Sequence, residues 1–533
     1  MQATPSNPSG LLRGASQSSR FYNAAADLLG RPLSAGRGEK IALIDDAGSY
    51  TYAALAQRVH RCANALRGLG LQCEHRIALC LLDTVDFPTS FLGAIQAGIV
   101  PVPLNTLLTP ADYAYILADS GVQAAIVSDA KLAAFQEAAR LAAWRGPIIV
   151  SGPTESGLPQ LAGLLESASP VAETAATRPD GVCFWLYSSG STGKPKGAVH
   201  LQSSLMRSAE LVAQGVWGLC WCDVVYSASK LFFAYGLGNS LSFPFSVGAT
   251  SILHGGHATP SAVSAVLRER RPTIFCAVPT LFSSLLASGQ APKAGEHALR
   301  FCVSSGEALP AELGRVWRAW TGVDIVEGIG STEMLHMFIA NRPGAVTYGA
   351  TGRPVPGYRV RLVDEGGAEM PPGEIGELQV SGPTAAAGYW NNPEKTRSTF
   401  LGQWTRTGDE FRQNDEGEFI HCGRADDMLK VGGIWVSPGE VEAALAAHEA
   451  VLEVGVVPAR DESGLIKPKA FVVLKPGRAP ADALARELQQ FVKDRLAHYK
   501  YPRWIEFVPS LPRTATGKLQ RYLLRVRGEP RGD

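Results

Sequence analysis

Between about residue 40 and residue 280, the sequence alternates short β-branched runs with stretches of helical periodicity. Runs of the first kind are Arg76–Leu82, Ala124–Ser128 and Thr273–Val278, whereas Tyr52–Leu69 is typical of an amphipathic helix. This alternation predicts βαβ units, in which helices cover both faces of a parallel sheet. A chain of 533 residues exceeds what one hydrophobic core usually supports, so we expect about three or four folding units.

The pattern changes after about residue 345. Closely spaced strands and turns, such as Tyr358–Val363 and Gly376–Ser381, predict a small antiparallel β unit up to about residue 425. A compact α+β segment follows, with helices expected at 437–447 and 481–497. Ser437 precedes the first of these helices as an N-cap, with a proline at the first helical position.

The charges of the chain nearly cancel, with 50 basic and 49 acidic side chains and a net charge of +1. This balance argues against nucleic acid or an anionic membrane as a partner, because both select a large basic excess. The stretch Leu231–Leu267 contains no charged residue, but its glycines, proline, histidines and serines do not suit a membrane helix. We therefore expect no membrane association, and we interpret this stretch as buried backbone around an apolar cavity.

The nine cysteines are odd in number and contain no Cys-x-x-Cys pair, so neither a zinc ribbon nor a thioredoxin-type site is predicted. Most lie in apolar runs, where a reduced thiol behaves as a small hydrophobic group. The first twenty residues lack the apolar core of a signal peptide. Together these features favour a reducing, cytoplasmic location.

The segment YSSGSTGKPKG at Tyr187–Gly197 follows an apolar run that predicts a strand. Glycine, serine and threonine present backbone N–H groups and hydroxyls without bulk, as a phosphate cradle requires. A Walker-type loop is rejected by the spacing, because Ser188 stands where glycine is needed and Pro195 follows the lysine in place of serine or threonine. The candidate phosphate-binding residues are Ser188, Ser189, Gly190, Ser191, Thr192 and Lys196.

Four further segments follow in order: EGIGSTE at Glu327–Glu333, WTRTGD at Trp404–Asp409, a run from Gly423 to Glu440, and PRTATGK at Pro512–Lys518. With the Ser/Gly loop, this series resembles the adenylate-forming superfamily, which includes acyl-CoA synthetases, luciferases and peptide-synthetase adenylation domains. The resemblance implies an α/β fold with a large N-terminal domain, residues 1–425, built from two doubly wound αβα subdomains and a small β-barrel-like subdomain. It also implies a small, mobile α+β C-terminal domain, residues 426–533.

The resemblance implies roles for individual residues around ATP. Thr332 corresponds to a threonine that contacts the α-phosphate, and Glu333 to a glutamate that helps hold Mg²⁺. Asp409 corresponds to the aspartate that binds both ribose hydroxyls, and Arg424 to an arginine that contacts the nucleotide. The loop against adenine corresponds to Ser305–Leu309, with Gly306, Glu307 and Ala308 as the candidate contacts.

The resemblance also implies a two-step reaction with a moving small domain. Lys518 corresponds to the catalytic lysine of acyl-adenylate formation, and Asp426 to the hinge. Gly432 and Gly433 correspond to the loop that lines the pantetheine tunnel after rotation, where glycine allows close backbone approach. Because the sequence ends fifteen residues after Lys518 and contains no Gly-Gly-x-Ser attachment motif, coenzyme A is favoured over a fused carrier domain as the thiol.

The acid substrate is suggested by two segments. The run Lys230–Gly238 lacks the aspartate that amino-acid-activating relatives use, and with Glu327–Ile339 it is most similar to the benzoate–CoA ligases. The candidate pocket residues are Ala234, Tyr235, Gly328, Gly330, His336 and Ile339. The expected activity is AMP-forming ligation of an aryl carboxylate to CoA, by a monomer or homodimer.

Four alternatives remain open from the sequence. They are a substituted aryl acid, a medium-chain fatty acid, an enzyme that loads a separate carrier protein, and a non-catalytic protein that has kept the fold. In addition, His336 and Tyr235 could be ordinary core residues rather than pocket residues.

Overall fold

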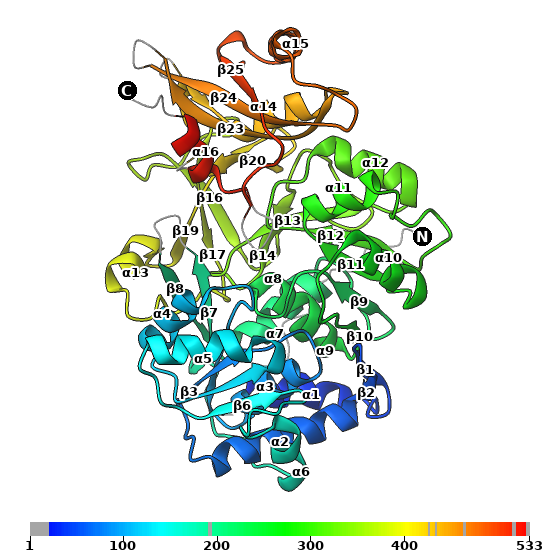
Figure 1. Cartoon of the computed structure of the whole chain (residues 1–533), viewed down its shortest axis with the longest axis vertical. Coiled ribbons are helices and arrows are strands. Elements are labelled where there is room, and N and C mark those ends of the chain that lie inside the picture. Colours follow the sequence, from blue (N-terminus) through cyan, green and yellow to red (C-terminus); the bar gives the residue numbers. More distant parts are fainter. Residues whose placement is uncertain are drawn as a thin grey trace, which may run out of the picture.

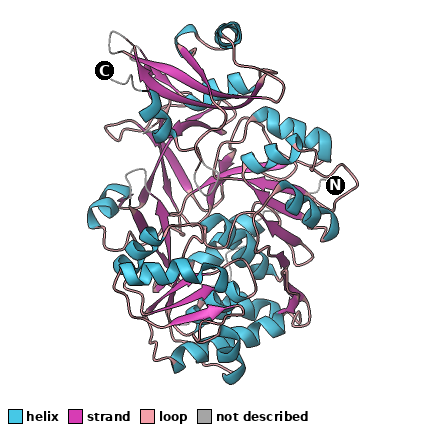
Figure 2. Ribbon diagram, viewed as in Figure 1, coloured by secondary structure: helices cyan, strands magenta, loops and turns pink. Residues whose placement is uncertain are grey.

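The computed structural model of the chain describes residues 21–189, 194–424, 427–431, 434–461, 465–513 and 519–528. Figure 1 shows a large body that contains the blue-to-yellow part of the chain and a smaller body at one end that contains the orange and red part. Helices and strands are interleaved through the large body (Figure 2). The site described below lies where these two bodies meet.

A four-stranded parallel sheet confirms the first set of βαβ units. Its strand order is β4-β3-β5-β6, with β3 at Arg76–Cys80, β4 at Val100–Pro103, β5 at Ala124–Ser128 and β6 at Ile148–Ser151. The accompanying helices are α1 (Ala24–Ser34), α2 (Tyr52–Gly68), α3 (Asp86–Gln96), α4 (Pro110–Ser120), α5 (Leu132–Leu141) and α6 (Leu161–Ser167). Thr51 caps α2 by accepting a hydrogen bond from the amide of Ala54, so the expected helix begins where its sequence predicts.

A nine-stranded sheet forms the second helix-covered layer, in the order β15-β14-β13-β12-β11-β9-β10-β1-β2. The six strands from β13 to β1 in this order are parallel, and the strands at both edges are antiparallel. The strands are β1 (Ile41–Ile44), β2 (Ser49–Thr51), β9 (Val224–Ser227), β10 (Thr250–Ile252), β11 (Ile274–Ala277), β12 (Phe301–Ser304), β13 (Ile325–Gly330), β14 (Met337–Ala340) and β15 (Arg353–Pro354). Its helices include α7 (Ser204–Ser208), η2 (Ala209–Gln214), α10 (Pro260–Glu269), α11 (Pro279–Ala287) and α12 (Ala311–Thr321).

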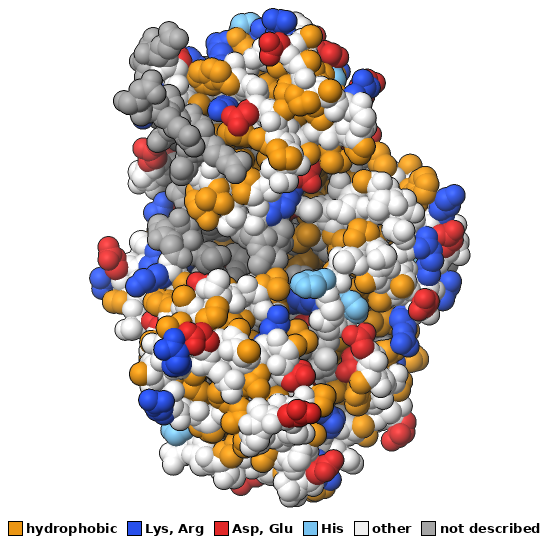
Figure 3. Space-filling view, in the orientation of Figure 1, with side chains coloured by type: hydrophobic (Ala, Val, Ile, Leu, Met, Phe, Trp, Pro, Cys, Tyr) orange, Lys and Arg blue, Asp and Glu red, His pale blue; other side chains and the backbone are white. Residues whose placement is uncertain are grey.

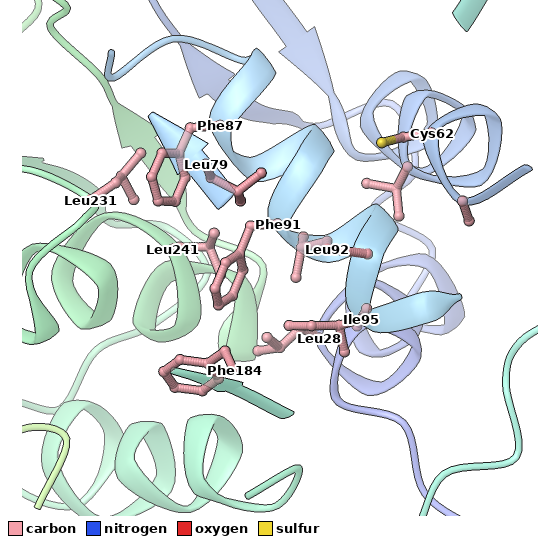
Figure 4. Close-up of a cluster of buried hydrophobic side chains, with 14 of the residues drawn as sticks. Leu28, Cys62, Leu79, Phe87, Phe91, Leu92, Ile95, Phe184, Leu231 and Leu241 are labelled. Atoms are coloured by element: carbon pink, nitrogen blue, oxygen red, sulfur yellow. The ribbon is translucent and has the colours of Figure 1, made fainter. Parts of the chain in front are cut away.

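The charge-free stretch lies largely in the core between the two sheets as far as Leu253, and residues 254–262 are partly or fully exposed. It forms α8 (Ala234–Leu237), a π-helical turn η3 (Gly238–Ser242) and α9 (Phe243–Val247). Leu231 and Leu241 pack with Phe91 and Phe184 from the four-stranded side of the molecule (Figure 4). Burial on both sides explains the absence of charge, since an unpaired charge is costly away from water. Among the described residues, no helix is long and apolar enough to cross a membrane.

The expected antiparallel unit is an open five-stranded sheet. It comprises β16 (Arg359–Val363), β17 (Gly376–Ser381), β18 (Phe400–Leu401), β19 (Trp404–Gln413) and β20 (Phe419–Arg424), with α13 (Pro393–Thr399) beside it. A separate antiparallel hairpin, β7 (Val182–Ser189) and β8 (Pro195–Leu201), meets this unit through a bridge between Ala198 and Tyr389.

The C-terminal segment is the expected small α+β unit. A three-stranded sheet of β23 (Val451–Arg460), β24 (Ile466–Leu474) and β25 (Trp504–Phe507) packs with α14 (Pro438–Ala446), α15 (Asp482–Lys493) and α16 (Arg521–Gly528). The shorter elements are β21 (Leu429–Val431), β22 (Ile434–Val436) and η4 (His498–Lys500). Ser437 caps α14 by accepting from the amide of Glu440, as predicted. The expected helix at 481–497 ends earlier, at Lys493, because the chain turns there before the separate turn of η4.

One pair of cysteines departs from the expectation of reduced thiols. Cys220 and Cys222 form a disulfide across one intervening residue, with Cα atoms 5.4 Å apart, a separation that a disulfide readily spans. The other seven are free, and all of these except Cys73 are buried. The neighbouring carboxylate of Asp223 is bound by the guanidinium of Arg300 at 2.8 and 2.9 Å. The Asp223 carboxylate oxygens and the two cysteine sulfurs are therefore already engaged in contacts within the protein.

Candidate active site

The site begins at the carboxyl ends of the neighbouring parallel strands β12 and β13, where ligands usually bind in open α/β sheets. Glu327 on β13 accepts a hydrogen bond from the amide of Leu309 at 3.0 Å, which fastens the loop after β12 to the next strand. Burial raises the pKa of Glu327 to about 8, although the amide of Leu309 partly opposes this. Gly306 and Ala308, in the predicted adenine loop, are exposed on the same edge, and Glu307 is partly exposed.

Thr332 and Glu333 follow β13 and are partly buried. The Glu333 backbone carbonyl accepts from the amide of Ala386 at 2.7 Å, and Oε1 accepts from the Tyr389 hydroxyl at 2.6 Å. Tyr389 also accepts from the Lys196 ammonium at 3.4 Å, and that ammonium lies 4.5 Å from the Tyr389 ring centroid. Burial lowers the pKa of Lys196, and Glu333 partly restores it. Tyr389 therefore joins the candidate phosphate-binding lysine to the candidate metal ligand.

Sequence reasoning missed Tyr389. The available signal was the pair of large aromatic residues Tyr389 and Trp390 in a connection made mostly of glycine, alanine, proline and small polar residues, which is unusual for a solvated loop. The structure explains this aromatic pair. Trp390 stacks on Trp185 of β7, with 4.5 Å between ring centroids, and so fixes the segment against the hairpin of β7 and β8.

The segment at Tyr187–Gly197 is a β-hairpin, in which Ser188 pairs with Lys196 and Ser189 with Pro195. A Walker-type loop connects a strand to a helix, so the hairpin confirms that this segment is of another kind. Three of the candidate phosphate contacts, Gly190, Ser191 and Thr192, lie outside the described residues.

Asp409 and Arg424 face each other in the pairing of β19 with β20. Arg424 Nη1 lies 3.1 Å from Asp409 Oδ1, and His421 Nε2 lies 3.6 Å from the same oxygen. Burial raises the pKa of Asp409, but His421 and Arg424 outweigh it and leave the pKa lowered. The carboxylate is thus kept ionised, as an acceptor of two hydroxyl donors should be. Gly408 has φ +70°, a left-handed conformation that favours glycine, and a Cβ there would lie 2.9 Å from the Arg424 guanidinium and push it aside.

The two segments that carry the candidate acid-pocket residues meet at Tyr235 and His336. Ala234 and Tyr235 lie on α8, and the other four lie on the hairpin of β13 and β14 or in its turn. The rings of Tyr235 and His336 are 5.6 Å apart, and the Tyr235 hydroxyl donates to the carbonyl of Val303 at 3.0 Å. Gly330 packs on the backbone of His336, where a Cβ would lie 2.5 Å from its carbonyl oxygen. Glycine at position 330 therefore allows the close backbone packing within the hairpin of β13 and β14.

His336 is enclosed by aromatic rings and is neutral. Phe243 lies 4.4 Å away between ring centroids and Trp217 lies 5.9 Å away. Burial lowers the pKa of His336 to about 3. Its Nε2 lies 3.2 Å from the side-chain oxygen of Asn239 on the π-helical turn, and Nδ1 has no hydrogen-bond partner among the described residues. Asn239, Phe243 and Trp217 were not predicted, because their approach depends on how the charge-free stretch folds back.

The remaining predicted residues are Lys518, the hinge Asp426, and the tunnel glycines Gly432 and Gly433. All four lie outside the described residues. Figure 3 shows the surface between the small body and the large one, where a hollow opens in the middle of the face and histidine side chains lie at its rim.

The residues described fit a nucleotide with a divalent cation. Glu333 offers a carboxylate whose second oxygen, Oε2, accepts from no donor in the described ranges, and Mg²⁺ commonly takes one or two carboxylates together with substrate phosphates. Lys196 supplies a partly buried positive charge nearby, and Asp409 an ionised acceptor. Fold and site together define an adenylate-forming enzyme.

Comparison with known proteins places the chain in a family. Residues 33–390 match the AMP-binding enzyme family and residues 440–518 match the AMP-binding enzyme C-terminal domain, so the chain belongs to this family. It is 58% identical over 506 residues to a benzoate–CoA ligase of Thauera aromatica, which covers 95% of this chain and 96% of that protein. It is 49% identical to a 4-hydroxybenzoate–CoA/benzoate–CoA ligase of Rhodopseudomonas palustris, over 95% of this chain and 94% of that protein. The crystal structure of a benzoate CoA ligase from Burkholderia xenovorans LB400 is 51% identical, with a TM-score of 0.89 over 95% of this chain and 100% of that one.

Proposed function

We propose that this protein is an ATP-dependent benzoate–CoA ligase, which converts benzoate, ATP and CoA into benzoyl-CoA, AMP and pyrophosphate. The observation that carries the proposal is the uncharged aromatic cluster around the neutral His336, which lies in the same turn between β13 and β14 as Thr332 and Glu333. An aromatic ring can pack there by edge or face contacts. The near full-length similarity to the Thauera aromatica and Burkholderia xenovorans proteins supports the same substrate.

In the first half-reaction, a benzoate oxygen attacks the α-phosphorus of ATP, the bond to pyrophosphate breaks, and benzoyl-AMP forms. Thr332 and Lys518 would contact the reacting phosphate and carboxylate, and Asp409 would hold the ribose. Two anions must approach and charge builds on the phosphate, so fixed positive groups lower the barrier. No proton changes hands in this step.

Mg²⁺ would be held by Glu333 and the phosphates, and when bound it neutralises phosphate charge. The fit rests on one carboxylate oriented by the Tyr389 hydroxyl. Tyr389 would keep Glu333 from turning toward Lys196, so that the lysine remains free for the phosphates.

In the second half-reaction, the CoA sulfur attacks the benzoyl carbonyl, the bond to AMP breaks, and the thiol proton passes to solvent. The domain boundary belongs to this step. Residues 1–425 would hold the adenylate, and residues 426–533 would rotate about Asp426, withdraw Lys518 and present Gly432 and Gly433 to the pantetheine arm.

A panel of acids tests the proposal. The protein is incubated with ATP, Mg²⁺, CoA and each acid, and the products are separated by chromatography. Benzoate should give benzoyl-CoA and AMP, and release of ADP would refute the mechanism. Formation of benzoyl-AMP without a CoA-dependent product would indicate a carrier-protein partner, and ATP binding without any product would indicate a non-catalytic protein.

A second candidate substrate is a hydroxybenzoate. The buried imidazole of His336 has a ring nitrogen, Nδ1, that a ring hydroxyl could contact, and the Rhodopseudomonas palustris relative is described for both acids. The ratio of kcat/KM for 4-hydroxybenzoate to that for benzoate decides between them. A value above one would make the hydroxy acid the preferred substrate.

We further propose that the protein is a cytoplasmic monomer or homodimer. The six buried free thiols support a reducing compartment, and the Cys220–Cys222 pair is the feature that a thiol assay on freshly lysed cells should examine. Light scattering on the eluting protein measures the oligomeric state.

A further inference from the structure

The described residues that flank 514–518, the segment that contains Lys518, are joined to each other and form its base. The carbonyl of Pro512 accepts from the amide of Gln520 at 2.9 Å, and Arg513 pairs with Leu519 in an antiparallel bridge. Leu519 is the residue after Lys518 in the sequence, so a group that fixes this base fixes the chain at the position next to the lysine.

The side chain of Arg513 extends from this base into the large body. Its Nη1 lies 3.1 Å from the Thr280 hydroxyl oxygen at the start of α11 and 3.6 Å from Oε1 of Glu307 in the loop after β12. Its Nη2 lies 3.1 Å from Oε2 of Glu453 on β23. The Thr280 hydroxyl donates to Glu307 Oε2 at 2.9 Å, so the three groups on the guanidinium form one network.

The partners of Arg513 belong to different bodies. Glu453 is part of the same small unit as Arg513, whereas Thr280 and Glu307 belong to the large one. The loop that contains Glu307 is itself held by the bond between Leu309 and Glu327. A planar guanidinium is suited to this task, because its forked donors can bind groups on two sides at once.

We propose that Arg513 is a positioning residue for the first half-reaction: it holds the base of the Lys518 segment against the loop predicted to contact adenine. Rotation of the small domain for thioester formation breaks the bonds to Thr280 and Glu307 and leaves the bond to Glu453. The inference rests on the two half-reactions of the proposed function. It assigns to Arg513 a role in adenylation that thioester formation does not share.

Arg513→Gln tests the assignment in two assays on the full chain. Acid-dependent exchange of pyrophosphate into ATP should fall about tenfold, the scale of losing a charged hydrogen bond at a partly exposed site. Formation of benzoyl-CoA from supplied benzoyl-AMP and CoA should stay unchanged. Equal loss in both assays, or no loss in either, would overturn the proposal.

Two further variants exclude a general effect on the fold. Arg478→Gln removes an exposed arginine of the small unit that pairs with Glu449, and it should leave both half-reactions unchanged. Thr280→Val removes a hydroxyl that Arg513 contacts in the large body. Its effect on exchange should largely vanish in the Arg513→Gln background, and full additivity of the two effects would contradict a shared network.

The proposed substrate, benzoate, and the proposed positioning role of Arg513 can be refuted independently of each other. If benzoate supports no exchange but another acid does, the proposed substrate is wrong, and the Arg513→Gln comparison is made with the active acid. If no acid supports exchange, amide hydrogen exchange in 305–309 is compared between the wild type and Arg513→Gln. Faster exchange of this loop in the variant supports the contact, and identical rates refute it.

Discussion

Replacing Tyr389 with phenylalanine removes one hydroxyl from the site and leaves the ring in place. The hydroxyl donates to Glu333 Oε1 at 2.6 Å, while the ring packs on Phe400 with 5.5 Å between centroids. Burial, reinforced by Glu333, raises the pKa of Tyr389, so the hydroxyl remains a donor at any working pH. Tyr389→Phe therefore isolates the orientation of one carboxylate.

The size of the effect follows from this bond. A hydrogen bond to a charged acceptor contributes about 1.5–3 kcal/mol, and the lower end applies because Glu333 is only partly buried. About 1.5 kcal/mol corresponds to roughly a tenfold change in an equilibrium constant. Since the carboxylate itself remains, we expect weaker binding of Mg²⁺ with ATP and little change in rate at saturating Mg²⁺.

The assay is acid-dependent exchange of pyrophosphate into ATP over a range of Mg²⁺ concentrations. The Mg²⁺ concentration for half-maximal exchange should rise about tenfold in Tyr389→Phe. Calorimetric titration with ATP and Mg²⁺ should show the same weakening without turnover. Conversion of supplied benzoyl-AMP to benzoyl-CoA should be unaffected, because the pyrophosphate has already left.

Tyr113→Phe is the matched control, since its hydroxyl donates to the carbonyl of Asn105 within the four-stranded part of the large body. It should change neither the Mg²⁺ dependence nor the affinity for ATP. The reasoning would be refuted if Tyr389→Phe left the Mg²⁺ dependence unchanged, or if both variants altered it equally.

Three other changes are informative. Lys518→Ala should reduce adenylation by about 100-fold or more and spare thioester formation from benzoyl-AMP, and equal loss in both half-reactions would contradict its role. Gly238→Ala places a Cβ 2.5 Å from the His336 ring, so the free energy of unfolding should fall by about 1–3 kcal/mol and the KM for benzoate should rise. An unchanged KM would show that His336 does not contact the acid. The pKa of Glu327 is raised to about 8 in the folded protein. The free energy of unfolding should therefore be greatest at a pH below the pKa that Glu327 has in the unfolded chain, and it should fall as the pH rises toward 8, by up to about 1.4 kcal/mol per pH unit. Chemical denaturation across this range should show the slope in the wild type and lose it in Glu327→Gln, where the amide oxygen can still accept from Leu309; a slope that persists would assign it to another group.

Much of the architecture could be predicted from local patterns. Strand β5 begins and ends at the expected residues, α2 ends one residue before its expected end, and Ser437 caps α14. These features depend on periodicity, capping and burial, which act over a few residues. The disulfide between Cys220 and Cys222 was not anticipated, because two cysteines one residue apart reveal neither their separation nor their oxidation state.

The sequence by itself determined the family and yielded the candidate residues of the site, since those motifs are contiguous and each can be read on its own. Only the tertiary structure showed which distant groups lie against these motifs. Tyr389 reaches Glu333 across 56 positions of sequence, and Arg513 reaches Thr280 across 233. Such contacts arise when sheets and loops from distant segments pack together, and no local pattern encodes that meeting. The candidate residues were therefore visible in the sequence, whereas the contacts that surround them became visible only in the fold.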